Sequence, residues 1–128
     1  MPEERGAEGS GEERQPDRQS EPGFAEAHYN RGVTLVALRR CAEAVASYDR
    51  ALALRPDFAQ AHADRGAALA ALGRYDAALA GYDRALALDP GATQARYNRG
   101  VALAVEQHDK GTREIIEDIL KDEKNKLN

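Results

Sequence analysis

Few side chains in this sequence have the types and spacing that catalysis needs. The chain has three histidines and a single cysteine, Cys41. It has no Gly-rich phosphate loop followed by Lys-Ser or Lys-Thr, no cysteine pair and no His-Glu-x-x-His motif. His28 and His62 share a register and are expected to pack between helices, Cys41 to act as a small apolar residue, and His108 to lie in an exposed loop. The sequence predicts no enzyme, no cofactor and no metal.

The charge pattern argues against further classes. The net charge is −4, and residues 1–23 hold seven acids and three arginines, which leaves fifteen acids and fifteen bases in the rest of the chain. A neutral domain argues against nucleic acid, because phosphate binding needs clustered Lys and Arg. No apolar run approaches the ~20 residues that span a bilayer, and the N-terminus lacks a signal-peptide pattern. We expect a cytoplasmic, bacterial protein that binds no membrane.

The chain divides into a tail and a domain. Residues 1–23 are rich in Glu, Arg, Gly, Pro, Ser and Gln, and Met1 is their one large apolar residue. Such a segment cannot offset the entropy of ordering, so we expect a disordered acidic tail. Residues 24–128 are expected to form the folded domain, with a core mainly of Ala, Leu and Val because aromatic residues make up only 5% of the chain.

The domain repeats itself with a period of 34 residues. ASYDRALALRP at 46–56 returns as AGYDRALALDP at 80–90, and the same step separates Gly32, Gly66 and Gly100. A fixed period of this length is typical of a solenoid whose units are single supersecondary elements. Three repeats are predicted, at about 25–58, 59–92 and 93–126.

Each repeat contains two helical patterns. Apolar residues such as Ala78, Tyr82 and Ala85 fall on one helix face, and Pro56 and Pro90 end the second helices. The first helices are expected at about 25–38, 59–72 and 93–105, and the second helices at about 42–54, 76–88 and 109–125. A glycine inside a helix costs about 1 kcal/mol. The three glycines in register therefore indicate close contact between paired helices, with Ala44 and Ala78 expected to face Gly32 and Gly66.

The repeat resembles the tetratricopeptide repeat. That family has small residues, an aromatic residue and a proline at fixed positions. In the second unit the matching residues are Gly66, Ala78, Tyr82, Ala85 and Pro90, and the first unit matches in the same way. The resemblance implies an all-α fold: a right-handed α-solenoid of three stacked helix-turn-helix hairpins. One departure is that His28 and His62 stand where the family often has Trp.

The third repeat is degenerate. All four lysines and all three isoleucines of the chain lie beyond Val105, and Thr112, Ile116 and Ile119 take the small, aromatic and small positions. We expect its second helix to complete the hairpin and to cap the solenoid. The same stretch is weakly similar to the last helix of bacterioferritins, whose iron-binding Glu-x-x-His corresponds to Glu123 and Lys126. Lysine cannot replace the imidazole, so no iron site is predicted.

The resemblance also implies a binding groove. In tetratricopeptide proteins the first helices line a concave side, where amides and tyrosines over small apolar residues suit a peptide. Tyr29 and Tyr97 are the strongest anchor candidates. Asn30 and Asn98 have an alternative role in bonding neighbouring helices. The predicted groove residues are Tyr29, Asn30, Val33, Gln60, Asp64, Gln94, Tyr97, Asn98 and Val101.

Charged clamps in the groove are not expected. The family's clamp for two-carboxylate chaperone tails uses Lys, Asn and Arg, whereas this chain has Tyr29, Val33, Gln94 and Asn98 at several of those positions. The row Arg31, Arg65 and Arg99 is expected to pair with acids between repeats, with an acidic partner as the alternative.

The predicted function is a non-catalytic adaptor that binds a protein or peptide. The alternatives are the interaction region of a larger glycosyltransferase- or sulfotransferase-type enzyme, and a ferritin-like iron-binding remnant. Because three hairpins are about the minimum for stable stacking, weak self-association is also expected.

Overall fold

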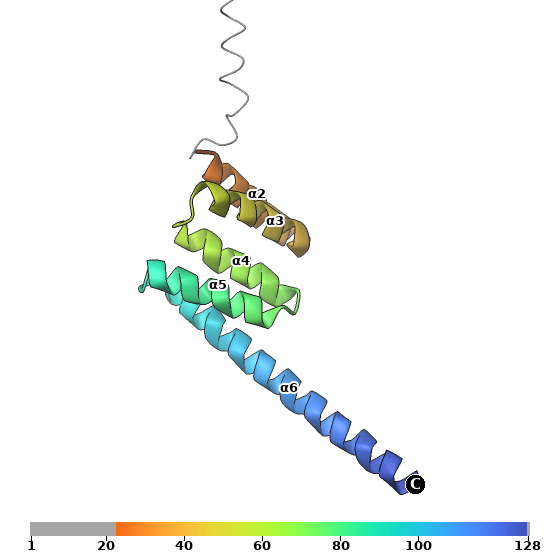
Figure 1. Ribbon diagram of the computed structural model, residues 1–128. Coiled ribbons are helices and arrows are strands. Elements are labelled where there is room, and N and C mark those ends of the chain that lie inside the picture. The colour runs from red at the N-terminus through yellow and green to blue at the C-terminus, as the bar shows by residue number, and fades with distance from the viewer. Residues whose placement is uncertain (1–22, 128) are drawn as a thin grey trace, which may run out of the picture.

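The structure, a computed structural model, describes residues 23–127, which form helices joined by short turns, with no strand in that range. The helices are α2 (Gly23–Ala37), α3 (Cys41–Leu54), α4 (Ala59–Ala71), α5 (Tyr75–Leu88) and α6 (Thr93–Leu127). Consecutive helices stack side by side, and α6 runs on past the stack (Figure 1). The predicted all-α repeat fold is confirmed. Of the expected N-terminal tail, only Gly23 is described, and it begins α2; the rest lies outside the described residues.

Two hairpins, α2–α3 and α4–α5, close through the same kind of turn. Arg39 has φ 64° and Gly73, one period later, has φ 79°. In each turn the next residue bonds back to the first helix: Arg40 N donates to Leu35 O at 2.8 Å, and Arg74 N donates to Leu69 O at 2.9 Å. The positive φ explains why glycine suits this position. In the first hairpin an arginine occupies it.

Each hairpin is held together by a tyrosine ring lying on a glycine. A Cβ atom on Gly32 would stand 2.5 Å from Tyr48 Cε1, and one on Gly66 would stand 2.9 Å from Tyr82 Cε1. Both rings are almost fully buried, and burial raises the pKa of Tyr48 to about 12. The expectation that Ala78 faces Gly66 is confirmed, since a Cβ on Gly66 would stand 3.1 Å from Ala78 O, whereas the atoms nearest to a Cβ on Gly32 belong to Tyr48 and not to Ala44. In both hairpins the tyrosine ring is the nearest neighbour and needs the space that the missing side chain leaves.

Ion pairs connect successive repeats. Arg65 Nε donates to Asp49 Oδ1 at 2.6 Å, and Arg99 Nε donates to Asp83 Oδ1 at 2.6 Å. Both pairs join the first helix of one repeat to the second helix of the repeat before it. The prediction of local arginine pairing is confirmed for these two residues, while Arg31 donates to Ser47 Oγ within its own hairpin at 2.5 Å.

The histidines and the cysteine take part in packing. His62 Nε2 lies 2.9 Å from Pro56 O, where it holds the loop that joins two repeats. Burial lowers the pKa of His28, and the nearby Arg50 and Arg31 lower it further. Cys41 is half-buried and packs against the core of the first hairpin.

The third hairpin is absent, which corrects the predicted separate helix at 109–125. α6 continues from Thr93 to Leu127 without a break, so His108 lies in a helix and not in a loop. Gln107 stands where Arg39 and Gly73 turn the chain, and its neighbours Glu106 and Lys110 are good helix formers. Lys110 Nζ and Glu106 Oε2 pair at 3.9 Å across the expected turn.

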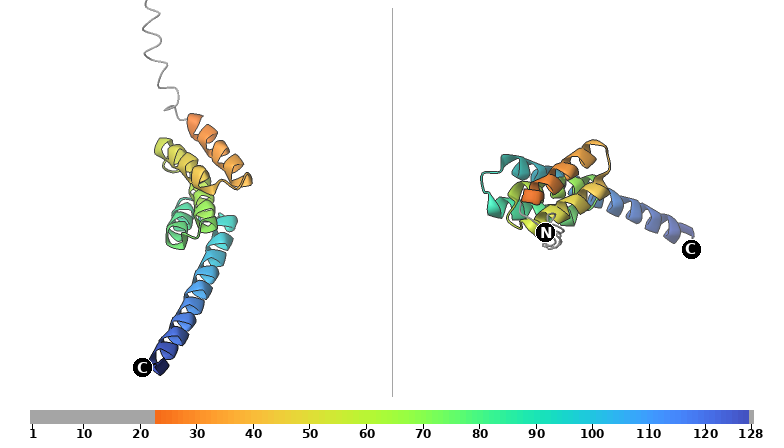
Figure 2. Two further views of the ribbon diagram at one scale, coloured as in Figure 1. Left: turned by 90° about the vertical axis from the view of Figure 1, so that its right-hand side faces the viewer. Right: turned by 90° about the horizontal axis from the view of Figure 1, so that it is seen from above.

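The distal half of α6 therefore caps nothing. Apart from the surrounding turns of α6 itself, no atom of residues 23–127 comes within 4 Å of a Cβ built on Gly100, because no second helix folds back onto it. Every residue from Thr112 to Lys126 is exposed, and two further views show α6 leaving the stacked helices (Figure 2). Among residues 23–127, no helix combines the length and apolarity that crossing a membrane requires.

Candidate functional site

Three hollows follow one another along the first helices of the repeats. The first has a volume of about 210 Å³, the second about 360 Å³ and the third about 230 Å³. Ala67 lines the first and second, Asp64 the first and third, and Asn98 the second and third. These shared walls make the hollows one continuous depression over α2, α4 and α6, which we call the groove.

Asp64 is the polar centre of the groove. Its carboxylate accepts a hydrogen bond from Tyr29 Oη at 2.6 Å and another from Gln60 Nε2 at 3.0 Å. Both donors are uncharged, so they fix the orientation of the carboxylate without neutralising its negative charge. Asp64 thus presents a positioned negative charge to whatever lies in the groove.

Tyr29 supports the groove more than it lines it. Its ring centroid lies 5.0 Å from that of Phe58 and 5.8 Å from that of Tyr48. Burial and the hydrogen bond to Asp64 raise the pKa of Tyr29 well above its ordinary value. The side chain is therefore part of a packed aromatic cluster, and its hydroxyl serves to hold Asp64.

The remaining walls are mainly apolar in the first two hollows and lined by amides in the third. The first hollow is lined by Val33, Val36 and Ala67 beside Tyr48 and Asp64. The second is lined by small and aromatic residues: Ala67, Ala70, Ala71, Tyr75, Tyr82, Asn98, Val101, Ala102 and Val105. In the third, Gln94 Nε2 donates to Asn98 Oδ1 at 3.0 Å. Among the described residues, no Lys or Arg lines any of the three hollows, whereas Asp64 and Asp89 do.

The structure brings most of the predicted groove residues together. Val33, Gln60, Asp64, Gln94, Asn98 and Val101 line the hollows, and Tyr29 joins them through Asp64. Asn30 and Tyr97 are exposed and line none of the three; Tyr97 is 68% exposed. Sequence reasoning missed Tyr75, Tyr48 and Tyr82, which reach the groove from the second helices. The signal for the last two was their position opposite the helical glycines.

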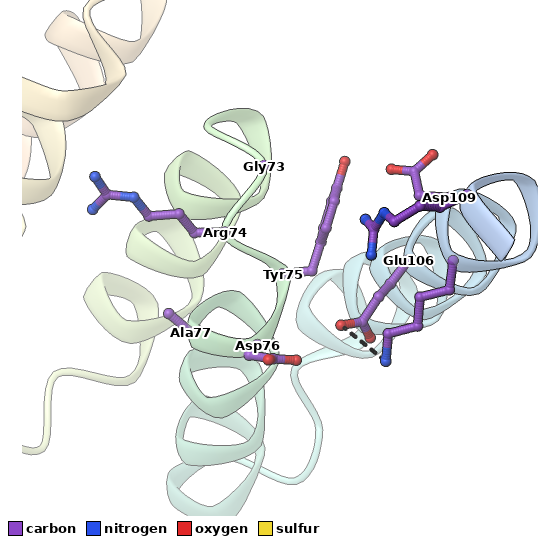
Figure 3. A pocket seen from close by; sticks show the side chains of 9 residues that line it. Gly73, Arg74, Tyr75, Asp76, Ala77, Glu106 and Asp109 are labelled. Atoms are coloured by element: carbon purple, nitrogen blue, oxygen red, sulfur yellow. Dashed lines mark ion pairs between the residues drawn. The ribbon is translucent and has the colours of Figure 1, made fainter. Parts of the chain in front are cut away.

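A larger hollow of about 620 Å³ lies to the side, where the turn between α4 and α5 meets α6. Asp76 of α5 points towards Glu106 of α6 in this side hollow (Figure 3). The neighbouring carboxylate of Asp76 raises the pKa of Glu106, and burial raises it further. In residues 23–127 no group of three or more His, Cys, Asp or Glu side chains could hold a metal ion.

Stacked hairpins with a groove along their first helices define a helical-repeat protein. The family model "Tetratricopeptide repeat" matches at residues 17–57, 29–93 and 68–109, which together span more than half of the chain. The chain therefore belongs to the tetratricopeptide repeat family. No curated protein matches the chain.

Several solved structures share the fold. A crystal structure of MamA has a TM-score of 0.63 and 26% identity, and the match covers 65% of this chain and 48% of MamA. The MamA RS-1 ArsTM double mutant has a TM-score of 0.63, 31% identity, and coverage of 76% and 53%. The second TPR of Spaghetti (RPAP3), bound to the HSP90 peptide SRMEEVD, has a TM-score of 0.64, 24% identity, and coverage of 76% and 85%. The chain spans about half the length of the MamA structures.

Proposed function

We propose that this chain is a non-catalytic interaction module that binds an extended peptide or protein segment in the groove. The observation that carries the proposal is the row of three connected hollows on the first helices, with Asp64 held in place by Tyr29 and Gln60. Side-chain amides can bond a peptide backbone, and shallow apolar hollows can take its side chains. RPAP3, a neighbour in fold, holds a peptide in the solved structure.

The lining also supports a ligand class. Because Asp64 and Asp89 are the charged residues of the three hollows, a ligand with a Lys, Arg or free amino group near small apolar side chains is favoured by charge complementarity. An acidic tail such as the one bound by RPAP3 would meet like charge. We therefore propose a basic or neutral apolar ligand and not a two-carboxylate chaperone tail.

A random peptide library displayed on phage tests this ligand class. We expect the purified chain to enrich peptides that combine a basic residue with small apolar residues. Enrichment of acidic peptides would contradict the charge argument, and no enrichment at all would contradict peptide binding.

Affinity measurements on the enriched peptide then locate the site. Asp64→Asn should weaken binding of the basic peptide by roughly tenfold, in the range for one charge-assisted hydrogen bond, and Val101→Asp should weaken binding further by placing a charge in an apolar hollow. Arg84→Ala on α5, whose side chain lines none of the three hollows, is the control and should bind like wild type. Equal affinities for all the variants would move the site away from the groove.

A further inference from the structure

The distal half of α6 carries a row of large apolar side chains that nothing in the described chain covers. Ile115, Ile116, Ile119 and Leu120 are 61%, 51%, 55% and 62% exposed. Their spacing puts them on one side of the helix, and we call this side the distal stripe. Isolated helices of about 15 residues are marginal in water. A partner that covers the distal stripe would therefore stabilise this part of α6.

We propose that the distal stripe binds the same stripe of a second copy of this chain, with the two α6 helices antiparallel. The helix has the charge order that such a pair needs. One edge of the distal stripe carries, in chain order, Glu106, Asp109, Arg113, Glu117 and Lys124. We place the two-fold axis of the antiparallel pair between Ile115 and Ile116. In this register, Lys124 of the second copy comes level with Glu106 and Asp109.

The same register complements the other charges close to the stripe. Arg113 comes level with Glu117 of the second copy, and His108 comes level with its Glu123. Because the pair is symmetric, each of these contacts occurs twice. In a parallel pair, Glu123, which lies on the central line of the distal stripe, would face Glu123 of the second copy. Like charges placed opposite each other are destabilising. The charge order therefore favours the antiparallel arrangement.

The side hollow supplies a second reason for a cation at this place. Asp76 and Glu106 are two acids that line this hollow together, and the nearby Asp76 carboxylate raises the pKa of Glu106. Lys110 approaches Glu106 only to 3.9 Å. Lys124 of a second copy would arrive at the same level of α6 and could pair with Glu106.

The contact is short, so the association is weak. The overlap from Glu106 to Lys124 is 19 residues long, or about 28 Å at 1.5 Å per residue. Two helices in contact over this length fall at the low end of specific interfaces, which bury about 1,200–2,000 Å² in total. The contact leaves Asp64 and the first hollow of the groove free, and it begins one residue beyond Val105, which lines the second hollow.

Sedimentation equilibrium of the full chain tests the self-association. We expect the mass to rise from 13.9 kDa towards twice that value with concentration. Ile116→Asp with Ile119→Asp should abolish the rise, and both positions are exposed, so the repeats should remain folded by circular dichroism. Lys121→Asp on the opposite side of the helix is the control and should associate like wild type. A mass that never rises, or a control that dissociates as the double variant does, would overturn the proposal.

Charge reversal and crosslinking test the orientation. Arg113→Glu should raise the dissociation constant roughly tenfold, since the exposed Arg113–Glu117 pair is weak but occurs twice, and adding Glu117→Arg should restore it. In a Cys41→Ser background, Ile115→Cys should form a disulfide-linked dimer because it lies near the two-fold axis, whereas Glu123→Cys should not. Crosslinking at 123, whatever the result at 115, would show a parallel pair and overturn the proposed arrangement.

Discussion

At the scale of single residues, glycine stabilises the fold at two of its repeated positions and destabilises it at the third. Gly32 and Gly66 lie under tyrosine rings, whereas Gly100, one period later, faces open space. A missing side chain is needed at the first two positions because a large aromatic ring fills its place. At the third position it only weakens the helix, because glycine gives the backbone freedom that folding must remove.

Alanine substitutions should separate these two situations. Gly66→Ala should lower the free energy of unfolding by about 1–3 kcal/mol, the usual cost of overpacking, because its Cβ would meet Tyr82 and the carbonyl oxygen of Ala78. Gly100→Ala should raise it by about 0.5–1 kcal/mol through helix propensity. Urea denaturation of both variants checks this. Equal effects of the same sign would mean that the ring contact does not limit the space.

At the scale of elements, the hairpin turn decides whether a repeat closes. Arg39 and Gly73 occupy the left-handed position of the two observed turns, and Gln107 stands at the same place in the third repeat, where no turn forms. Arg39 shows that a residue other than glycine can be held there. What the first hairpin has in addition is Tyr48 on Gly32; the third repeat has Ile116 in place of the tyrosine.

Exchanging the turn residues should show the cost of the left-handed backbone. Arg39→Gly should raise the free energy of unfolding by about 0.5–1 kcal/mol. Removing a side chain from positive φ relieves about 1–2 kcal/mol, and the greater freedom of glycine in the unfolded chain offsets part of this gain. Gly73→Arg should lower it by a similar amount. Thermal melts of the two variants give the comparison, and unchanged melting for both would contradict the strain argument.

At the scale of the whole molecule, the chain consists of a packed body and a projecting helix. The body is stacked by tyrosine rings within hairpins and by arginine–aspartate pairs between them, and these contacts involve only neighbouring elements. Solenoids of this kind gain stability from each repeat and its nearest interface. Because residues 112–126 are exposed, they add little to the stability of the body.

Removing residues 112–128 should therefore leave the body intact. In dilute solution the shortened chain should unfold with the same free energy as the full chain to within about 0.5 kcal/mol, as for surface changes that touch no special feature. The melting temperature of the full chain should rise with protein concentration, whereas that of the shortened chain should not. A loss above about 1 kcal/mol in dilute solution would show that the distal half packs on the repeats.

The sequence predicted the first two repeats well because their pattern is local. Tyr48 and Tyr82, Pro56 and Pro90, and the helical glycines recur in register, and the observed helix ends lie within two residues of the predicted ones. The second helix of the third repeat was predicted wrongly because its apolar spacing fits either a packed second helix or an exposed stripe. The choice depends on whether the chain turns at Gln107, which is settled by packing and not by periodicity.

The groove was predicted only in part, because the repeat pattern fixes helix faces but not the packing of individual side chains. The repeat register put Val33, Asp64, Asn98 and Val101 on the side of the first helices where the hollows lie, since it fixes which side of a helix each residue occupies. It did not indicate that Tyr29 would be tied to Asp64 and packed on Phe58, because that contact joins residues 35 positions apart through side-chain directions. The contribution of the second helices through Tyr75 was missed for lack of a repeated signal.

The length of α6 separates two charged regions of the molecule electrically. Along a straight helix, Lys124 lies about 35 Å from Val101 at 1.5 Å per residue. In physiological salt, the influence of an exposed charge decays over about 8 Å. Within a single chain, a charge reversal near the end of α6 therefore leaves the electrostatic potential at Asp64 unchanged.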